Sequence, residues 1–332
     1  MKIFKTALTT WDKASIDLAD SLEEMTTLGI EAHSRMLYHT QDPEMIITAL
    51  KDYDYIIAGS ERLDESTLPY LKKLCFVMRN GVGYDNVDLI CASRLGIAVA
   101  YAPGVNAPWV AEHTLALMLD VARKISCFST CIKSGNYNCA SGLTHSLSGE
   151  KTVGLVGFGA IARWVAKYIN PFGVETIACD PLVSALEMKR NGAKKVDLCE
   201  LLERSDFVSM HLPASEDTYH IADKGFFSKM RTNAIFINTA RGSVVDEQAL
   251  CDALESRRIA GAGLDVFESE PLEPESRLKT LDNTVLTPHT ASRSIACYKT
   301  AIRFSANSIA MFHKGEEIPT LLNPEYKDHK RF

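Results

Sequence analysis

The chain has 332 residues, enough for a large core and for two domains. Hydrophobic residues make up 46% and charged residues 23%, which is the composition of a folded, soluble protein. With 36 basic and 42 acidic side chains the net charge is −6, so the charge favours neither nucleic acid nor an anionic membrane as a partner.

Export and membrane insertion are not expected. No apolar run reaches the roughly 18 residues of a membrane span, and the first residues lack the apolar centre of a signal peptide. The nine cysteines form no CxxC pair, which favours reduced thiols over a metal site or a disulfide framework. We therefore expect a cytoplasmic protein without a metal.

The first hundred residues alternate short apolar runs with amphipathic stretches, which predicts an α/β unit with parallel strands. Expected strands are 3–8, 32–36, 55–58, 75–78 and 98–100. Expected helices are 15–28, 43–51, 67–73 and 87–94. The glycine-rich segment 79–86 follows the fourth strand, where open α/β sheets bind ligands. Its backbone N–H groups could hold a small anion, or the segment could be a structural turn.

A domain connection is expected at 101–108, because this segment contains two prolines and a glycine. The stretch 108–133 is apolar on most faces, which predicts one long helix buried on all sides between domains or subunits. Residues 134–149 are polar and rich in serine and glycine, and we expect them to form an extended arm.

A dinucleotide-binding fingerprint follows. A short apolar strand leads into Gly157, Gly159 and Ala162, then a helix, then a second strand that ends at Asp180. Gly157 permits a tight turn, and Gly159 allows close approach of a pyrophosphate. The N-terminus of the helix stabilises the negative charge of that pyrophosphate. Asp180 is placed to accept hydrogen bonds from ribose hydroxyls and repels a 2′-phosphate. The pattern therefore predicts NAD rather than NADP.

The second half continues the same alternation and predicts a doubly wound parallel sheet. Expected strands are 153–156, 176–179, 207–211, 234–238, 263–266 and 284–286. Expected helices are 161–169, 183–191, 198–204, 224–229 and 246–256. The last helix, 293–313, has Ile295, Ile302, Ile309 and Phe312 on one face and a stop at Gly315. It can cross back to pack on the first domain.

Three strands of this half are followed by groups that can do chemistry: Arg241, Glu270 and His289. Because the carboxyl ends of parallel strands share one edge, these side chains are expected to meet beside the cofactor. A guanidinium can grip a carboxylate, an imidazole can move the hydroxyl proton, and a carboxylate can orient the imidazole. Each group also has an ordinary structural interpretation. His211 and His113 compete with His289, and three neighbouring glutamates compete with Glu270.

These residues carry a resemblance to the D-isomer-specific 2-hydroxyacid dehydrogenases, and most of all to the branch of D-3-phosphoglycerate dehydrogenase. The similarity covers nearly the whole chain. It is carried by RNGVGYDNVD at 79–88, APGVN at 102–106, VAEHTLAL at 110–117, VGFGAIA at 156–162, HLP at 211–213, INTARGSVVD at 237–246, GLDVFESEP at 263–271 and PH at 288–289.

The resemblance implies two Rossmann-like, doubly wound domains. The NAD-binding domain, 102–296, is inserted into a discontinuous substrate domain made of 1–101 and 297–332. The resemblance also implies a homodimer built on the helix and arm at 108–149. The implied reaction is hydride transfer between NAD(H) and a small D-2-hydroxy acid or 2-keto acid, with 3-phosphoglycerate as one candidate.

The resemblance also assigns roles to residues. It implies Arg241 for the substrate, His289 as acid and base, and Glu270 as partner of His289. The amides around Val82 and Gly83 would hold the substrate carboxylate, and Arg62 would lie toward a substrate phosphate. Cofactor contacts are implied for Gly157, Gly159, Ala160, Ile161, Asp180, Thr239, Ala240, Arg241, Asp265, His289 and Ser292.

Some features depart from that branch. Ala162 stands for the third glycine of the fingerprint, and HTAS at 289–292 stands for the more usual His-Ile-Gly-Gly. Only about 17 residues follow Gly315, so no C-terminal regulatory domain is expected. Two other functions stay open at this point: an NAD(H)-sensing corepressor without turnover, and a dehydrogenase of another small oxyanion such as phosphite.

Overall fold

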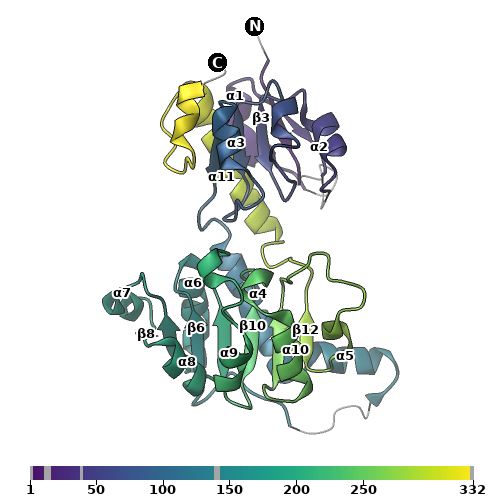
Figure 1. Ribbon diagram of the computed structural model, residues 1–332, viewed down its shortest axis with the longest axis vertical. Coiled ribbons are helices and arrows are strands. Elements are labelled where there is room, and N and C mark those ends of the chain that lie inside the picture. Colours follow the sequence, from purple (N-terminus) through teal and green to yellow (C-terminus); the bar gives the residue numbers. More distant parts are fainter. Residues whose placement is uncertain (1–2, 11–15, 38–39, 138–142, 330–332) are drawn as a thin grey trace. The chain divides into compact units, whose positions relative to one another are not determined.

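The computed structural model describes residues 3–10, 16–37, 40–137 and 143–329. The expected arm at 134–149 therefore lies partly outside the described residues, at 138–142. The chain divides into two compact units (Figure 1). The first unit is Met1–Asn106 with Arg293–Phe332, and the second is Ala107–Ser292. These limits differ by a few residues from the domain limits predicted from the sequence.

The first unit contains a five-stranded parallel sheet with the order β2-β1-β3-β4-β5. The order reverses at β1, so the gap between the ends of β1 and β3 is the topological switch point of this sheet. Its strands are β1 (Lys5–Leu8), β2 (Glu31–Ser34), β3 (Tyr55–Ala58), β4 (Phe76–Arg79) and β5 (Ala98–Tyr101).

The helices of the first unit are α1 (Ala19–Thr27), α2 (Pro43–Leu50), α3 (Leu89–Arg94) and α11 (Ile295–Lys314). Local sequence sets their starts: Asp42 caps α2 ahead of Pro43, and Asp88 caps α3. The helix predicted at 67–73 is wrong. Only a 3₁₀ turn, Leu68–Tyr70, forms there, because a segment this short and interrupted by Pro69 cannot sustain an α-helix.

Helix α11 packs against α1, β3 and β4 within the first unit. Ile302 and Ile309 are fully buried, and Phe312 stacks on Phe76 with 4.6 Å between ring centroids. Gly315 ends the helix with a φ of +75°, which confirms the predicted stop. The prediction that Ile295 belongs to the buried face is wrong. Its side chain is 68% exposed, since it lies in the first turn, before the buried stripe begins.

The second unit contains a seven-stranded parallel sheet with the order β12-β11-β10-β9-β6-β7-β8. Its order reverses at β6, where the fingerprint strand has β7 on one side and β9 on the other. Its strands are β6 (Thr152–Val156), β7 (Glu175–Cys179), β8 (Lys194–Lys195), β9 (Phe207–Met210), β10 (Ile235–Asn238), β11 (Gly261–Leu264) and β12 (Thr284–Leu286).

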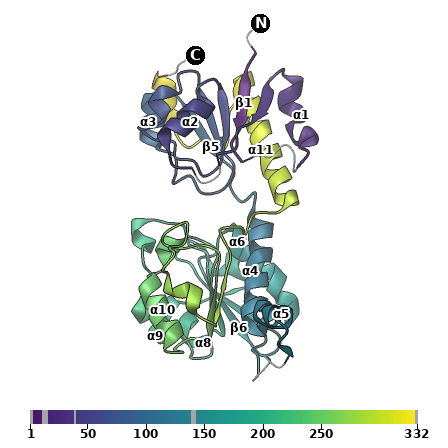
Figure 2. The same ribbon diagram turned by 90° about the vertical axis from the view of Figure 1, so that its right-hand side faces the viewer.

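Helices cover both faces of this sheet. Figure 2 shows α4 and α6 on one face and α8, α9 and α10 on the other. The helices of this unit are α4 (Ala107–Arg123), α5 (Ile125–Lys133), α6 (Ala160–Ile169), α7 (Ala185–Arg190), α8 (Leu198–Arg204), α9 (Lys224–Lys229) and α10 (Glu247–Glu255). None of the helices in the described ranges is long and apolar enough to cross a membrane.

The prediction of a single long helix at 108–133 is wrong. The helix breaks at Lys124, whose backbone has the left-handed conformation (φ +53°) that ends a helix and starts a new one at an angle. The predicted burial on all sides, between domains or subunits, is not reached within the single chain, and burial against a second subunit stays a prediction. The buried residues of α4 lie along one face, and no residue of α5 is buried in this chain.

Candidate active site

The turn between β6 and α6 has the backbone that the glycine fingerprint requires. Gly157 has a φ of +90°, and a β-carbon there would lie 2.7 Å from the carbonyl oxygen of His211. Only glycine meets both conditions without strain. Gly159, by contrast, has no atom within 4 Å of the position of a β-carbon, so the space in front of the N-terminus of α6 is open. This open cradle, beside free helix N–H groups, fits a pyrophosphate.

Asp180 follows β7 and is tied to the same turn. Its Oδ2 accepts from the Phe158 amide at 2.8 Å, and its Oδ1 accepts from the Leu182 amide at 2.8 Å. Each carboxylate oxygen can accept a further hydrogen bond. The carboxylate is thus held at the edge of the turn and can still accept from ribose hydroxyls.

Arg241 follows β10 in a turn that buried polar groups hold. The Asn238 side chain accepts from the Ala240 amide at 3.0 Å and donates to the Arg241 carbonyl at 2.9 Å. The next residue, Gly242, packs so closely that a β-carbon would overlap the carbonyl of Phe267. The turn that carries Arg241 is therefore locked against the loop that carries Glu270.

The loop after β12 is built around the buried carboxylate of Asp265, which is 0% exposed. Its Oδ1 accepts from the Thr287 hydroxyl and the Thr290 amide, and its Oδ2 accepts from the Ala291 amide at 2.8 Å. The Asp265 carbonyl accepts from the His289 amide at 2.8 Å. These bonds hold His289 at a φ of +51°, a strained conformation of the kind found at functional sites.

Glu270 and His289 meet at this edge. His289 Nδ1 lies 2.7 Å from Glu270 Oε2, and Glu270 Oε1 accepts from the Phe267 amide at 3.2 Å. The hydrogen bond with Glu270 raises the pKa of His289 above its ordinary value of 6.5, although burial opposes the change. Burial, the largest single cause, acts to raise the pKa of Glu270, but the hydrogen bond and charge of His289, the Phe267 amide and the charge of Arg241 together lower that pKa. The charge of Arg241 is close enough to lower both pKa values.

The two rival histidines have other surroundings. His211 is partly exposed as a residue, but its Nε2 is buried without a hydrogen-bond partner among the described residues. Burial lowers the pKa of His211 to about 3, so it stays neutral and cannot serve as an acid. His113 on α4 lies 2.9 Å from the Thr287 hydroxyl. Because that hydroxyl donates its hydrogen to Asp265, the imidazole Nε2 must donate to Thr287. His113 therefore supports the loop that carries His289.

The other cofactor residues predicted in the second unit lie around the same edge. Ala160 and Ile161 form the first turn of α6, Thr239 and Ala240 precede Arg241, and Ser292 ends the unit. The Thr239 hydroxyl is 2.8 Å from that of Thr114, which donates to the Val110 carbonyl. Their cofactor contacts, and that of Asp265, stay predictions.

Sequence reasoning missed Asn238, Thr287 and His113 as supports of this edge. The only indication in the sequence that Asn238 and Thr287 support the site is their position at or next to the end of a strand. Their partners are set by the fold, so the sequence could not assign them a role.

Three predicted substrate residues belong to the first unit. Val82 and Gly83 lie in the loop after β4, and Val82 is 37% exposed. Within the described parts of the chain, neither of their amides makes a hydrogen bond. Arg62 lies in the loop after β3, is 67% exposed and forms an ion pair with Asp64.

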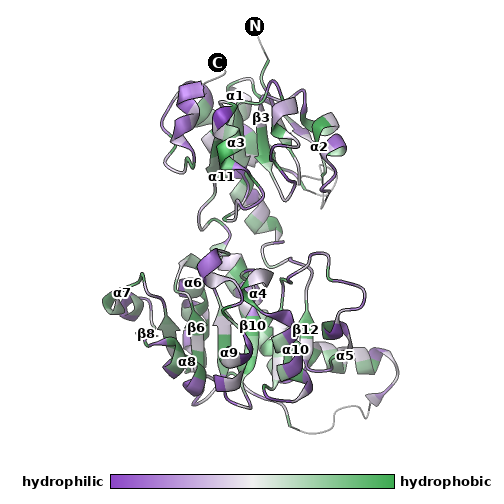
Figure 3. Cartoon of the chain, in the orientation of Figure 1, coloured by the Kyte–Doolittle hydropathy of each residue, from purple (hydrophilic) through white to green (hydrophobic). Residues whose placement is uncertain are grey.

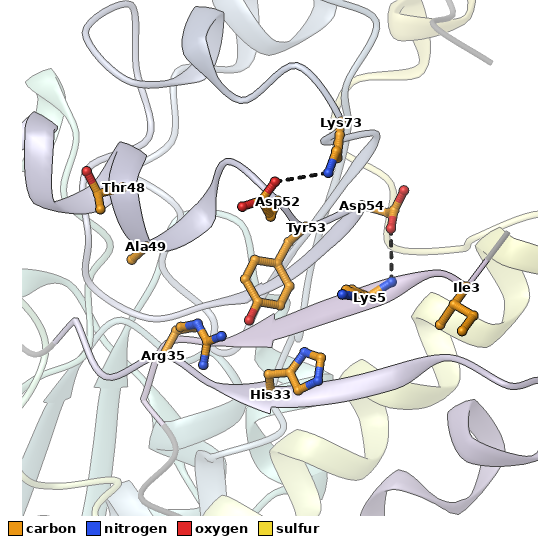
Figure 4. Close-up of a pocket in the computed structure, with 10 residues that line it drawn as sticks. All are labelled: Ile3, Lys5, His33, Arg35, Thr48, Ala49, Asp52, Tyr53, Asp54 and Lys73. Atoms are coloured by element: carbon orange, nitrogen blue, oxygen red, sulfur yellow. Dashed lines mark hydrogen bonds and ion pairs between the residues drawn. The ribbon is translucent and has the colours of Figure 1, made fainter.

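A hollow of about 620 Å³ lies elsewhere in the first unit (Figure 4). Lys5, Asp54 and Lys73, which line it, come from the segments that enter β1, β3 and β4. Lys73 is paired with Asp52 at 3.0 Å, and Arg35 lies over the ring of Tyr53. Parallel sheets bind ligands at the carboxyl ends of their strands. We therefore do not assign the active site to this hollow.

Comparisons with known proteins agree with the geometry. Residues 115–291 match the family described as D-isomer specific 2-hydroxyacid dehydrogenase, NAD binding domain. A glyoxylate reductase of Korarchaeum cryptofilum is 36% identical over 94% of this chain and 97% of its own length. A D-3-phosphoglycerate dehydrogenase of Archaeoglobus fulgidus is also 36% identical, over 84% of this chain, but the match spans only 53% of that protein.

The fold has matches among solved structures. The apo-structure of D-lactate dehydrogenase from Escherichia coli superposes with a TM-score of 0.84, over 96% of this chain and 100% of that one, at 26% identity. Together with the open cradle at Gly159 and the charged edge beside it, these matches identify the chain as a member of the D-isomer-specific 2-hydroxyacid dehydrogenase family, an enzyme that uses NAD.

Proposed function

We propose that this enzyme interconverts a small, unphosphorylated 2-keto acid and the corresponding D-2-hydroxy acid, with Arg241, Glu270 and His289 as its reacting groups. The observation that carries the proposal is the 2.7 Å contact between His289 Nδ1 and Glu270 Oε2. It occupies one ring nitrogen. Among the residues that the structure describes, none forms a hydrogen bond with the other nitrogen, Nε2, which is therefore available to the substrate oxygen.

Each group has one part in the reaction. Arg241 offers parallel N–H donors to the substrate carboxylate. Protonated His289 donates its Nε2 proton to the keto oxygen during reduction, and the neutral ring takes the hydroxyl proton during oxidation. Glu270 fixes the ring orientation and stabilises the imidazolium. NAD(H), when bound, supplies or accepts the hydride.

The residues proposed to hold the cofactor are those of the fingerprint turn and its edge. Gly157, Gly159 and the first amides of α6 would bind the pyrophosphate, and Asp180 would bind the adenine ribose. A 2′-phosphate beside the Asp180 carboxylate would place like charges together, a cost of several kcal/mol. We therefore expect NADH to bind at least ~100-fold more tightly than NADPH.

One observation supports an unphosphorylated substrate. Arg62, the one residue predicted to meet a substrate phosphate, already forms an ion pair with Asp64. We propose glyoxylate, hydroxypyruvate or pyruvate as the substrate class.

The test is NADH oxidation by the purified protein with glyoxylate, hydroxypyruvate, pyruvate and 3-phosphohydroxypyruvate. The proposal predicts a higher kcat/KM for an unphosphorylated acid. A strong preference for 3-phosphohydroxypyruvate would instead assign Arg62 to a phosphate. Tight NADH binding without turnover of any acid would contradict the enzyme and favour an NAD(H) sensor.

Replacing Glu270 with glutamine is expected to lower the pKa of His289, because the imidazolium loses its carboxylate partner. The pH at which reduction begins to fail should therefore move down, and kcat at neutral pH should fall at least ~10-fold. The measurement is the pH dependence of kcat for the variant and for Glu273→Gln, a control in the same exposed loop. An unchanged pH profile in Glu270→Gln would show that Glu270 does not tune His289.

A homodimer is part of the proposal. Helix α5 carries hydrophobic and hydrophilic residues (Figure 3), yet Ile125 is 55% and Ile132 is 51% exposed in the single chain. Apolar helix positions of this kind are normally covered. We expect the wild type to elute as a dimer and Ile125→Glu/Ile132→Glu as a monomer, measured by light scattering. A wild-type monomer would refute this part.

A cytoplasmic location is also part of the proposal. Its support is the state of the cysteines: the eight that lie in described residues are free thiols.

A further inference from the structure

A buried carboxyl group lies at the switch point of the sheet in the first unit. Glu61 follows β3 and is only 1% exposed. Burial raises the pKa of this carboxyl, while hydrogen bonds and the nearby charge of Arg79 oppose the change. A buried carboxyl group lowers the stability of a fold unless its oxygens accept hydrogen bonds. Glu61 also lies at the edge where parallel sheets bind ligands. Its contacts therefore indicate what it holds in place.

Glu61 holds the end of β3. Both of its carboxyl oxygens lie 3.1 Å from the Gly59 amide, which also donates to the Thr9 hydroxyl at 2.8 Å. Thr9 follows β1, so these bonds join the ends of the two strands that flank the switch point. A β-carbon at Gly59 would lie 2.3 Å from the Thr10 side chain, so the two strand ends are also packed without space.

The same segment holds both ends of the glycine-rich loop 80–85. Asn86, at the far end of the loop, donates to the carbonyls of Glu61 (2.6 Å) and Gly59 (3.2 Å). Arg79, at the near end, donates to the Asn86 side chain at 3.1 Å and to the Ala58 carbonyl at 3.3 Å. The segment 58–61 is thus the common anchor of the two ends of the loop.

The tip of the loop differs from its ends. Val82 and Gly83 carry adjacent amides that make no hydrogen bond within the described ranges, and Val82 is exposed. Adjacent free N–H groups on a loop with fixed ends are suited to a carboxylate. Their usefulness depends on the loop having one position, because misplacing a binding group by about 1 Å can cost ~100-fold in rate.

We propose that Glu61 and Asn86 are positioning residues that hold the amides of Val82 and Gly83 in place for the substrate carboxylate. The proposal rests on the proposed function in one respect, that the loop binds the substrate. Neither residue touches the substrate. Both act through the segment 58–61, to which they are hydrogen-bonded at Gly59 and at the Glu61 carbonyl.

The test compares Glu61→Ala, Asn86→Ala and Glu61→Gln with the wild type. Both alanine variants should raise KM for glyoxylate by ~10-fold or more, with kcat within ~3-fold and the Kd of NADH unchanged. Glu61→Gln keeps the shape and one acceptor oxygen, so it should recover most of the loss. Glu65→Ala is the matched control, because Glu65 lies in the same loop but is exposed and paired with Arg94.

Amide hydrogen exchange of Asn80 and Val87, which donate to the carbonyls of Ala58 and Tyr84 at the two ends of the loop, gives a second measurement that needs no turnover. Exchange should speed up ~10-fold or more in both alanine variants and stay unchanged in Glu65→Ala. Unchanged exchange in folded alanine variants, shown by normal NADH binding, would overturn the proposal whatever the substrate. Faster exchange with an unchanged KM would also overturn it, since the held loop would not serve the substrate. Absence of keto acid turnover in the wild type would contradict the proposed function instead.

Discussion

Replacing His289 with glutamine is expected to lower kcat for keto acid reduction by about 10²–10⁴-fold, the usual contribution of a positioned general acid. Glutamine has a similar length and can still bond to Glu270, but it cannot release a proton near neutral pH. The Kd of NADH should change less than ~3-fold, because the phosphate and ribose contacts proposed for the cofactor lie on other residues. Stopped-flow measurement of NADH oxidation, with fluorescence titration of NADH, checks both parts.

His220→Gln provides the control. His220 belongs to the same unit and is also paired with a glutamate, Glu268, but it lies outside the proposed reacting set. It should keep kcat within ~3-fold. If His289→Gln retained wild-type turnover, or if both variants lost it equally, the assignment of the acid to His289 would be wrong.

The second large effect is expected at Arg241. Lysine in its place keeps the positive charge but loses the planar pair of donors that a carboxylate accepts. We expect kcat/KM for the keto acid to fall by about 10²–10³-fold, as for the loss of an aimed donor in other active sites. The affinity for oxamate, an unreactive mimic of the substrate, should fall with it, which a calorimetric titration of the NADH complex measures.

Arg257→Lys is the matched control, since Arg257 lies in the same unit and forms an exposed pair with Asp282. It should leave both quantities unchanged. A normal oxamate affinity in Arg241→Lys would mean that the carboxylate binds elsewhere.

Much of the fold follows from sequence pattern. Two examples are the strands β3 (Tyr55–Ala58) and β10 (Ile235–Asn238), which are almost entirely apolar. This is the pattern expected for parallel strands that are buried on both faces of a sheet. The errors arose where local conformation departs from pattern. The residues around Lys124 do not predict a left-handed backbone conformation at that position. The two-residue strand β8 forms because it pairs with β7, and its own sequence does not predict it.

The candidate site was predictable to a similar extent. Glu270 and His289 follow strands that share one edge, so their meeting could be expected. The supports could not be foreseen, because they depend on pairings between distant segments. Asp265 and Thr287 are 22 residues apart, and Asn86 bonds to the Glu61 carbonyl 25 residues away. Only the folded chain shows that these side chains hold loops in place.

The most direct test of the account is the pH dependence of kcat/KM for the wild type in both directions. In the proposed mechanism, reduction needs protonated His289 and oxidation needs the neutral ring. The bond to Glu270 raises the pKa of His289 above 6.5. We expect the rate of reduction to fall and the rate of oxidation to rise as the pH increases through this one raised pKa, and His289→Gln to abolish both transitions. Profiles that change in the same direction, or that persist in His289→Gln, would contradict the proposed mechanism.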